Sequence, residues 1–307
     1  MKPFNSVLAL IKKFPNDTAC RAYLEQIRWG KTPACCFCGS TNAYKFPSEK
    51  RYRCRDCNKK YSATVGTIFE NTKIPLQKWF IAIYLLSAHK KGISSLQLSR
   101  DIDVTQKTAW FMLHRVREML AVNDPQLFNS MVEIDETYIG GKRKNKHVSK
   151  RKNNGASGWF RDEKTAVIGI VERQGKVISF PVSSAIKSEV EPHINKHVVK
   201  GSRVITDESP IYREVKENYN HTTINHAAKQ YVVGDVHTNT IEGYWSLLKR
   251  GLFGIYHQVS PKHLHRYCNE FSYRYNTRKD FEDERFYDVI LNAESKRLKY
   301  SDLTKKS

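Results

Sequence analysis

Residues 131–139 read MVEIDETYI, and the larger part of the chain can be organised around this stretch. Its β-branched and aromatic residues alternate with polar ones, a pattern typical of a half-buried β-strand. Strand alternation places Asp135 on the opposite face from Ile134 and Glu136. A carboxylate in such a strand costs desolvation free energy unless a cation or hydrogen bonds compensate for it. Asp135 is therefore the first candidate for a functional site.

Two more carboxylates stand in comparable contexts. Further strands are expected at residues 166–172, 177–181 and 203–206, followed by a helix at 211–218. Asp207 ends the run RVITD.

Glu242 lies in NTIEGYWSLLKR, residues 239–250, whose apolar residues recur at helical spacing. One such acid alone is more often a solvated surface group, but three on a basic chain favour a common metal site. Two divalent ions about 3.5–4 Å apart, held by carboxylates, support in-line phosphodiester cleavage.

The cysteines are concentrated near the N-terminus. Two C-x-x-C pairs match the spacing of a structural zinc site, which takes four thiolates from two tight turns. The expected zinc ligands are Cys35, Cys38, Cys54 and Cys57. Gly39 and Asn58 follow the two pairs, where the turn favours a residue that tolerates positive φ. Cys36 is expected to be free. The basic and aromatic residues around this module favour nucleic-acid binding over a purely structural ribbon.

Residues 95–120 have the rhythm of a helix-turn-helix, with a break at 101–104 and Thr105 as the N-cap of the second helix. We expect DNA contacts from the first turn of that helix and from two later arginines. The base-reading candidates are Gln106, Lys107 and Thr108, and the phosphate-binding candidates are Arg115 and Arg117. A basic loop at 142–164 is expected to grip the DNA backbone, with Lys142, Arg143 and Lys144 as its first contacts.

The chain has 307 residues, with 52 Lys and Arg against 31 Asp and Glu, so its formal net charge is +21. With 40% hydrophobic residues it can bury a core, which excludes a disordered or collagen-like chain. The longest apolar stretch, residues 79–86, is far below the roughly 20 residues that cross a bilayer. The N-terminal apolar run is broken by Lys12 and Lys13, so no signal peptide is expected. We expect a cytoplasmic protein associated with the nucleoid, with no membrane partner.

Several runs resemble the DDE-type transposases of bacterial insertion sequences, specifically the group numbered fifteen-ninety-five, also called ISXO-like. These runs are VEIDETYIGGK, RVITDES, HTNTIEGYWSLLKRGLFGIYHQVSPKHLHRY and NEFSYRYNTR. The resemblance implies an α/β chain: a ribonuclease-H-like catalytic domain, with a mixed sheet flanked by helices, preceded by a small zinc ribbon and a helix-turn-helix-like segment. The expected divisions are a helical lead-in at 1–30, the ribbon at 31–67, the DNA-binding segment at 68–122, the catalytic domain at 128–280 and a C-terminal tail at 281–307.

The same resemblance assigns roles to individual residues. Asp135 would be the first catalytic aspartate and Asp207 the second, and the third position falls on Glu242, with Asn239 on the same helix face as the alternative or a second contributor. Lys249 would contact DNA near the scissile phosphate, although a solvated surface position is equally compatible with the sequence.

Other residues near the expected site have simpler interpretations. His237 would lie near the metals or make a structural hydrogen bond. Tyr138, Tyr244 and Trp245 are interpreted as packing residues.

The implied activity is Mg²⁺- or Mn²⁺-dependent hydrolysis of the phosphodiester at the element's ends, followed by attack of the freed 3′-hydroxyl on target DNA. In this scheme two ions act, with Asp135 bridging both and Asp207 and Glu242 each holding one. The expected partner is double-stranded DNA, both terminal inverted repeats and target, and joining two ends implies a homodimer or a larger assembly. The alternatives are a non-catalytic zinc-ribbon and helix-turn-helix regulator, an inactive transposase copy and a ribonuclease of the same fold.

Overall fold

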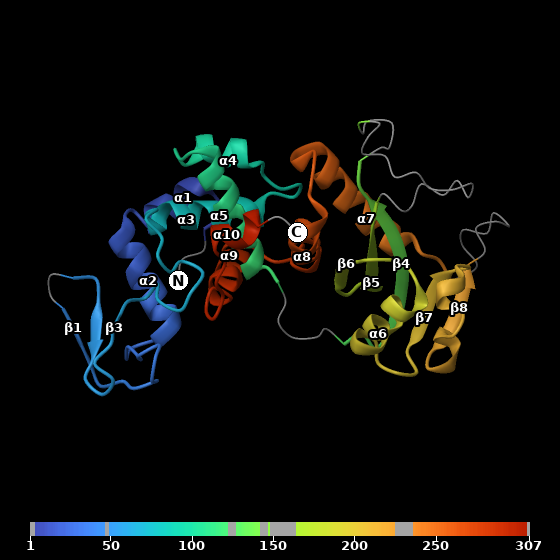
Figure 1. Ribbon diagram of the computed structural model, residues 1–307, viewed down its shortest axis with the longest axis horizontal. Coiled ribbons are helices and arrows are strands. Elements are labelled where there is room, and N and C mark those ends of the chain that lie inside the picture. The colour runs from blue at the N-terminus through green and yellow to red at the C-terminus, as the bar shows by residue number, and fades with distance from the viewer. Residues whose placement is uncertain are drawn as a thin grey trace. The chain divides into compact units, whose positions relative to one another are not determined.

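The computed structural model describes residues 4–46, 49–121, 127–141, 147, 164–224 and 236–305. The chain divides into two compact units. Unit 1 comprises Met1–Leu120 and Lys279–Ser307, and unit 2 comprises Ala121–Arg278 (Figure 1). In the part of the chain that is described, no helix has the length and apolarity needed to cross a membrane.

Unit 2 is built on a five-stranded mixed sheet in the order β6-β5-β4-β7-β8. The strands are β4 (Met131–Ile139), β5 (Thr165–Glu172), β6 (Val177–Val182), β7 (Arg203–Asp207) and β8 (Asn220–Ile224). The first three form an antiparallel meander, whereas β7 runs parallel to both β4 and β8. This mixed sheet confirms the expected fold class and agrees with the ribonuclease-H-like fold that the resemblance implies.

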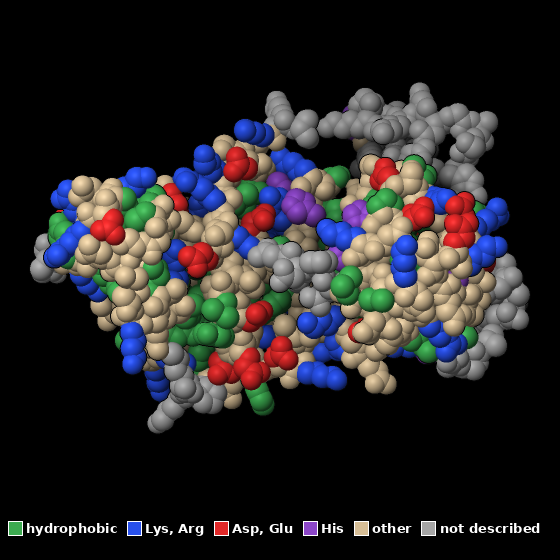
Figure 2. Space-filling model, turned by 90° about the horizontal axis from the view of Figure 1, so that it is seen from below, with side chains coloured by type: hydrophobic (Ala, Val, Ile, Leu, Met, Phe, Trp, Pro, Cys, Tyr) green, Lys and Arg blue, Asp and Glu red, His purple; other side chains and the backbone are tan. Residues whose placement is uncertain are grey.

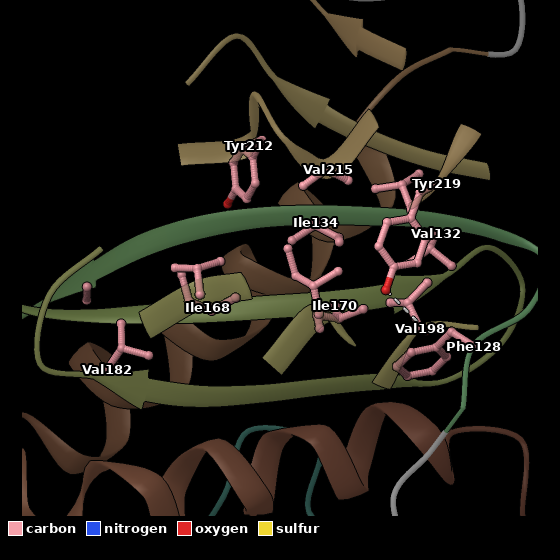
Figure 3. Packing of buried hydrophobic residues seen from close by; sticks show 14 residues of the cluster. Phe128, Val132, Ile134, Ile168, Ile170, Val182, Val198, Tyr212, Val215 and Tyr219 are labelled. Carbon is pink, nitrogen blue, oxygen red and sulfur yellow. Dashed lines mark hydrogen bonds between the residues drawn. The ribbon is translucent and has the colours of Figure 1, made fainter. Parts of the chain in front are cut away.

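Helices cover both faces of the sheet, because the inner strands bury both faces. The even-numbered residues of β4, such as Val132 and Ile134, pack in a cluster that includes Val190 and Ile194 of α6 (Lys187–His197) (Figure 3). Val167, Val171 and Val177 face the other way, into a cluster formed by α7 (Asn239–Gly251) and α8 (Leu264–Asn276). Short helical turns complete the unit: η4 (Pro210–Tyr212), η5 (Val215–Glu217), the π-helical η6 (Leu252–Tyr256) and η7 (Pro261–His263).

The prediction of a helix at 211–218 is wrong. The structure has the two 3₁₀ turns η4 and η5 in its place. Tyr212 ends η4 and Val215 begins η5, and both side chains are buried against the sheet (Figure 3).

Two glycines allow close packing in unit 2, one between β5 and α7 and the other between α7 and α8. A Cβ atom added to Gly169 of β5 would lie 2.6 Å from the Trp245 ring and 2.8 Å from Ile241 of α7. At Gly251, the end of α7, an added Cβ would lie 1.9 Å from the Phe271 ring of α8. Neither position can accept a larger side chain without displacing an aromatic ring.

Unit 1 is mostly helical. Its helices are α1 (Val7–Lys13), α2 (Asp17–Trp29), α3 (Leu76–Ala88), α4 (Ser95–Asp101), α5 (Gln106–Met119), α9 (Glu282–Leu291) and α10 (Tyr300–Thr304). Phe286 of α9 contacts the rings of Phe4, Phe14, Tyr23 and Phe80. The C-terminal residues that we expected to form a tail therefore complete the N-terminal core, because α9 contributes a buried aromatic face to it.

The helix-turn-helix geometry is as expected from the sequence. Thr105 caps α5, since its side chain accepts a hydrogen bond from the Thr108 amide. The preceding turn contains Asp103 in the left-handed region, with φ of +49°. α4 and α5 are thus separated by a tight turn within unit 1.

The ribbon is a small antiparallel sheet of β1 (Ala43–Lys45), β2 (Tyr52–Cys54) and β3 (Lys60–Tyr61). Trp29, the last residue of α2, contacts the rings of Tyr52 and Tyr61. Arg28 donates hydrogen bonds to the main-chain carbonyls of Ala63 and Val65. The lead-in helix and the ribbon therefore share one packed unit.

Candidate active site and zinc ribbon

The two predicted aspartates lie side by side at the ends of adjacent parallel strands. In the β4–β7 ladder Glu133 is opposite Ile205, so advancing each strand by two residues brings Asp135 opposite Asp207 on the same face. Carboxylate oxygens of Asp135, Glu136 and Asp207 all lie within 4.8 Å of one another, and all three residues are partly exposed. This arrangement suits a cation with hard oxygen ligands.

Asp135 is held by two hydrogen bonds and opposed by two charges. Its Oδ2 accepts from Trp245 Nε1 at 2.9 Å, and its Oδ1 accepts from the Glu136 amide at 2.8 Å. Burial is the main reason why the pKa of Asp135 rises to about 6, and the charges of Asp207 and Glu242 raise it further. Ionised Asp135 is therefore disfavoured in spite of its two hydrogen bonds, which is the electrostatic condition that a divalent cation relieves.

Glu136 was not among the candidates from sequence, because strand alternation directs it away from Asp135. Its Oε2 accepts a hydrogen bond from the hydroxyl of Tyr212 at 2.9 Å, and Tyr212 is buried in the core on the α6 side. Burial, followed by the charge of Glu136, raises the pKa of Tyr212 well above its usual value, so Tyr212 stays a hydrogen-bond donor. The only hint in the sequence was the adjacent pair of acids in the run IDET.

The third predicted acid is near this group but outside it. Glu242 is exposed in the first turn of α7, and its Oε1 accepts from the Thr238 hydroxyl at 3.2 Å. Its charge contributes to the raised pKa of Asp135, but the described acids whose oxygens lie within 4.8 Å of one another are Asp135, Glu136 and Asp207. Asn239 is exposed at the start of the same helix.

Lys249, seven residues beyond Glu242, is partly exposed near the end of α7. His237 lies beside Glu133, with 3.5 Å between its Nδ1 and Glu133 Oε1. Tyr244 is buried in the α7–α8 core, as expected. Trp245 is also buried there, but it additionally contacts the carboxylate of Asp135.

The four predicted zinc ligands come together. Their sulfur atoms lie within 4.8 Å of one another, and Cys35 Sγ–Cys57 Sγ and Cys38 Sγ–Cys54 Sγ are both 3.6 Å apart. Zn–S bonds of about 2.3 Å in a tetrahedron require a separation of about 3.8 Å, so the thiols fit zinc. Gly39 and Asn58 have φ of +75° and +59°, as the knuckle turns were expected to need. Cys36 is exposed and outside the group.

The recognition-helix candidates are accessible, but the later arginines are not. Gln106 and Lys107 are exposed and Thr108 is partly exposed. Arg115 is only 8% exposed, and its guanidinium donates to the main-chain carbonyls of Ile68 and Leu298. The assignment of Arg115 to phosphate contact is therefore wrong, because its hydrogen-bonding groups hold unit 1 together. Arg117 is only 1% exposed, so its burial excludes it from phosphate contact as well.

Positive charge is spread widely over the molecular surface. Figure 2 shows Lys and Arg side chains across the face in view, with acidic side chains between them. Lys142, Arg143 and Lys144 of the expected basic loop lie outside the described residues.

A mixed sheet with paired aspartates at the ends of adjacent parallel strands, joined to a four-cysteine ribbon, is the architecture that the resemblance to DDE-type transposases implies. Comparison with known families agrees. Residues 128–276 match the ISXO2-like transposase domain, and residues 15–60 match the transposase zinc-ribbon domain. The chain therefore carries an ISXO2-like transposase domain and a transposase zinc-ribbon domain.

One relative is an uncharacterized protein in the transposable element ISH50 of Halobacterium salinarum. The two chains are 29% identical over 275 residues, which covers 86% of this chain and 92% of the relative. The similarity therefore extends through both units.

Proposed function

We propose that this chain binds the terminal inverted repeats of an insertion sequence and catalyses metal-dependent DNA strand cleavage followed by strand transfer. The observation that carries the proposal is the pairing of Asp135 with Asp207 at the ends of β4 and β7. Aspartates in this arrangement hold divalent ions in enzymes that cleave phosphodiesters. The match of residues 128–276 to a transposase domain supports the same reaction class.

Asp135 and Asp207 are the first two proposed metal ligands, and the cation would be Mg²⁺ or Mn²⁺ because the donors are carboxylate oxygens. When bound, two such ions lower the pKa of an attacking water or 3′-hydroxyl and stabilise the leaving oxygen. Trp245 keeps one oxygen of Asp135 in a fixed orientation through its indole N–H. Lys249, on the same helix, is proposed to bind a phosphate next to the scissile bond. The attacking oxygen comes from water or DNA, so no covalent bond to the protein is needed.

The third ligand is proposed to be Glu242, with Asn239 as the alternative or a second contributor. Support for Glu242 comes from its electrostatic effect on Asp135, which requires proximity. Glu136 competes for this role because its oxygen already lies in the carboxylate group. Separate Glu242→Gln, Asn239→Ala and Glu136→Gln variants distinguish the three, since loss of a ligand raises the Mn²⁺ concentration needed for half-maximal cleavage, whereas loss of a bystander does not.

The DNA contacts are proposed to come from the first turn of α5, through Gln106, Lys107 and Thr108, and from the loop that begins at Lys142. Two element ends must be held together for transfer, so a homodimer or a larger assembly on DNA is part of the proposal. The zinc ribbon would add contacts through its exposed basic side chains.

The test is cleavage of a labelled duplex that carries the element's own terminal repeat, with and without added Mg²⁺ or Mn²⁺. Omitting the ion is a better control than a chelator, because a chelator would also remove zinc from the ribbon. We expect cuts at the repeat boundary that disappear in Asp135→Asn and Asp207→Asn, with repeat binding retained. Specific binding without any cleavage by the zinc-loaded wild type would instead favour a DNA-binding regulator or an inactive copy.

A further inference from the structure

Glu133 is a buried carboxylate two residues before Asp135 on the same face of β4. Its side chain is fully buried, and Arg173, directly after β5, donates from Nε to its Oε1 at 2.7 Å. A buried carboxylate is stable only where charge and hydrogen bonds compensate for its desolvation. The partners of Glu133 therefore indicate what this residue holds in place.

Those partners are mainly at the start of α7. The amides of Thr240 and Ile241 both donate to Glu133 Oε2 at 3.0 Å, and the Thr240 hydroxyl donates to Oε1 at 2.9 Å. The first amides of a helix have no partner within the helix. Thr238, at the N-cap position, directs its hydroxyl to Glu242 instead. A strand carboxylate thus takes the role that a capping side chain normally has.

The α7 helix is consequently fixed to β4 at two points. Glu133 holds the amide of Ile241, and Asp135 holds the indole of Trp245 one helical turn further on. Glu133 and Asp135 are two residues apart on one face of β4, and Ile241 and Trp245 are four residues apart on one face of α7. The two contacts can therefore form at the same time. Glu242 lies on α7 between these two points, so its distance from Asp135 depends on both.

The chain two residues before the helix is fixed by the same ion pair. Arg173 donates from Nη2 to the carbonyl of His237 at 2.7 Å, while its Nε binds Glu133. One carboxylate and one guanidinium therefore fix the entry of the chain into α7 as well as its first turn.

We propose that Glu133 is a positioning residue, which sets where α7 begins relative to β4 and so holds Glu242 and Asn239 at the carboxylate pair. This inference rests on the proposed function for the meaning of that placement. Glu133 itself would contact neither DNA nor metal, because its side chain is fully buried and both of its oxygens already accept hydrogen bonds from protein groups.

The test compares Glu133→Gln with Glu270→Gln. The control removes another fully buried carboxylate that is paired with an arginine in unit 2, Arg274, and that accepts from the hydroxyl of Tyr256. The two variants lose similar interactions, but Glu270 lies on α8, away from the start of α7. Two quantities are measured in zinc-loaded protein: hydrogen exchange of the amides of residues 240–242, and the Mn²⁺ concentration that half-saturates the protein, from water-proton relaxation.

We expect Glu133→Gln to lower protection of the 240–242 amides by about tenfold or more and to raise half-saturating Mn²⁺ by a similar factor, as loss of charge-assisted hydrogen bonds predicts. Glu133→Gln should lower the protection of the β5 amides no more than Glu270→Gln does. The Glu270→Gln variant should leave Mn²⁺ binding unchanged. Equal effects of both variants on exchange and Mn²⁺ binding would overturn the proposal and leave Glu133 as a core ion pair.

Failure of the proposed function gives a different result. In that case the wild type itself shows no Mn²⁺ binding that Asp135→Asn removes. The exchange measurement would still decide whether Glu133 holds the start of α7.

Discussion

Replacing Asp135 with asparagine should stabilise unit 2 in the absence of divalent ions. Burial, and then the charges of Asp207 and Glu242, raise the pKa of Asp135 to about 6 from 3.8. A carboxyl whose pKa is raised on folding favours the folded state while it is protonated, and this advantage is lost as pH rises from about 4 to above 6. At pH 8 the ionised group costs about 3 kcal/mol, because its pKa is about 6 in the folded protein against 3.8 otherwise.

Asparagine removes the charge at nearly constant volume. It can keep one of the two hydrogen bonds, to Trp245 Nε1 or to the Glu136 amide, but not both. Losing one bond costs about 1 kcal/mol, so the net stabilisation at pH 8 should be about 2 kcal/mol. Mg²⁺ should stabilise the wild type at pH 8 by binding the folded state and should have little effect on the variant.

The measurement is the opening free energy of β4 and β5 amides, from hydrogen exchange in zinc-loaded protein at pH 8 and pH 5. These amides report on unit 2 separately from unit 1. A suitable control is Glu191→Gln, which removes a partly exposed carboxylate on α6 and should change stability by a few tenths of a kcal/mol at most. A destabilised Asp135→Asn protein at pH 8, or an equal effect at both pH values, would refute the electrostatic reasoning.

Four further substitutions test other parts of the structure. Gly169→Ala should push Trp245 away from Asp135, because the new Cβ would lie 2.6 Å from the indole ring. We expect it to lower the stability of unit 2 by about 1–3 kcal/mol and to alter the fluorescence of the indole. Unchanged fluorescence would contradict that contact. Cys57→Ser should abolish stoichiometric zinc and the exchange protection of the ribbon while leaving β5 protection intact, and retained zinc would show that three thiols suffice. Arg115→Ala should destabilise unit 1 by about 3 kcal/mol because it leaves buried carbonyls unpaired, without changing the salt dependence of DNA binding, whereas Lys107→Ala, at a base-reading position, should reduce the preference for the terminal repeat over unrelated DNA by about 1–3 kcal/mol.

Local spacing predicted the zinc ribbon well. The ligands lie three residues apart in each turn, and positive φ at Gly39 and Asn58 follows from that local geometry. The strand that carries Asp135 could be predicted from alternation, and Asp207 from its place at a strand end. These features depend on neighbours in sequence.

The features that sequence did not predict depend on distant partners. Arg115 was assigned to phosphate because its charge suggested exposure, but its partners Ile68 and Leu298 come from elsewhere in the chain. The C-terminal helix α9 fills a core whose other aromatic residues lie before residue 90. Glu136 has an oxygen within 4.8 Å of the two aspartates and a hydrogen bond from Tyr212, a residue 76 positions away, and no local pattern indicates either contact.

The contrast between Glu133 and Asp135 explains where a cation would bind. Both carboxylates project from the same face of β4, but Glu133 has an arginine and helix amides as partners, so the protein compensates its charge. Asp135 has two neutral donors and faces the charges of Asp207 and Glu242. The fold therefore satisfies one carboxylate to fix α7 and leaves the other in excess negative potential. A divalent ion is the partner that this excess charge favours, and it would bind beside the helix that the first carboxylate holds.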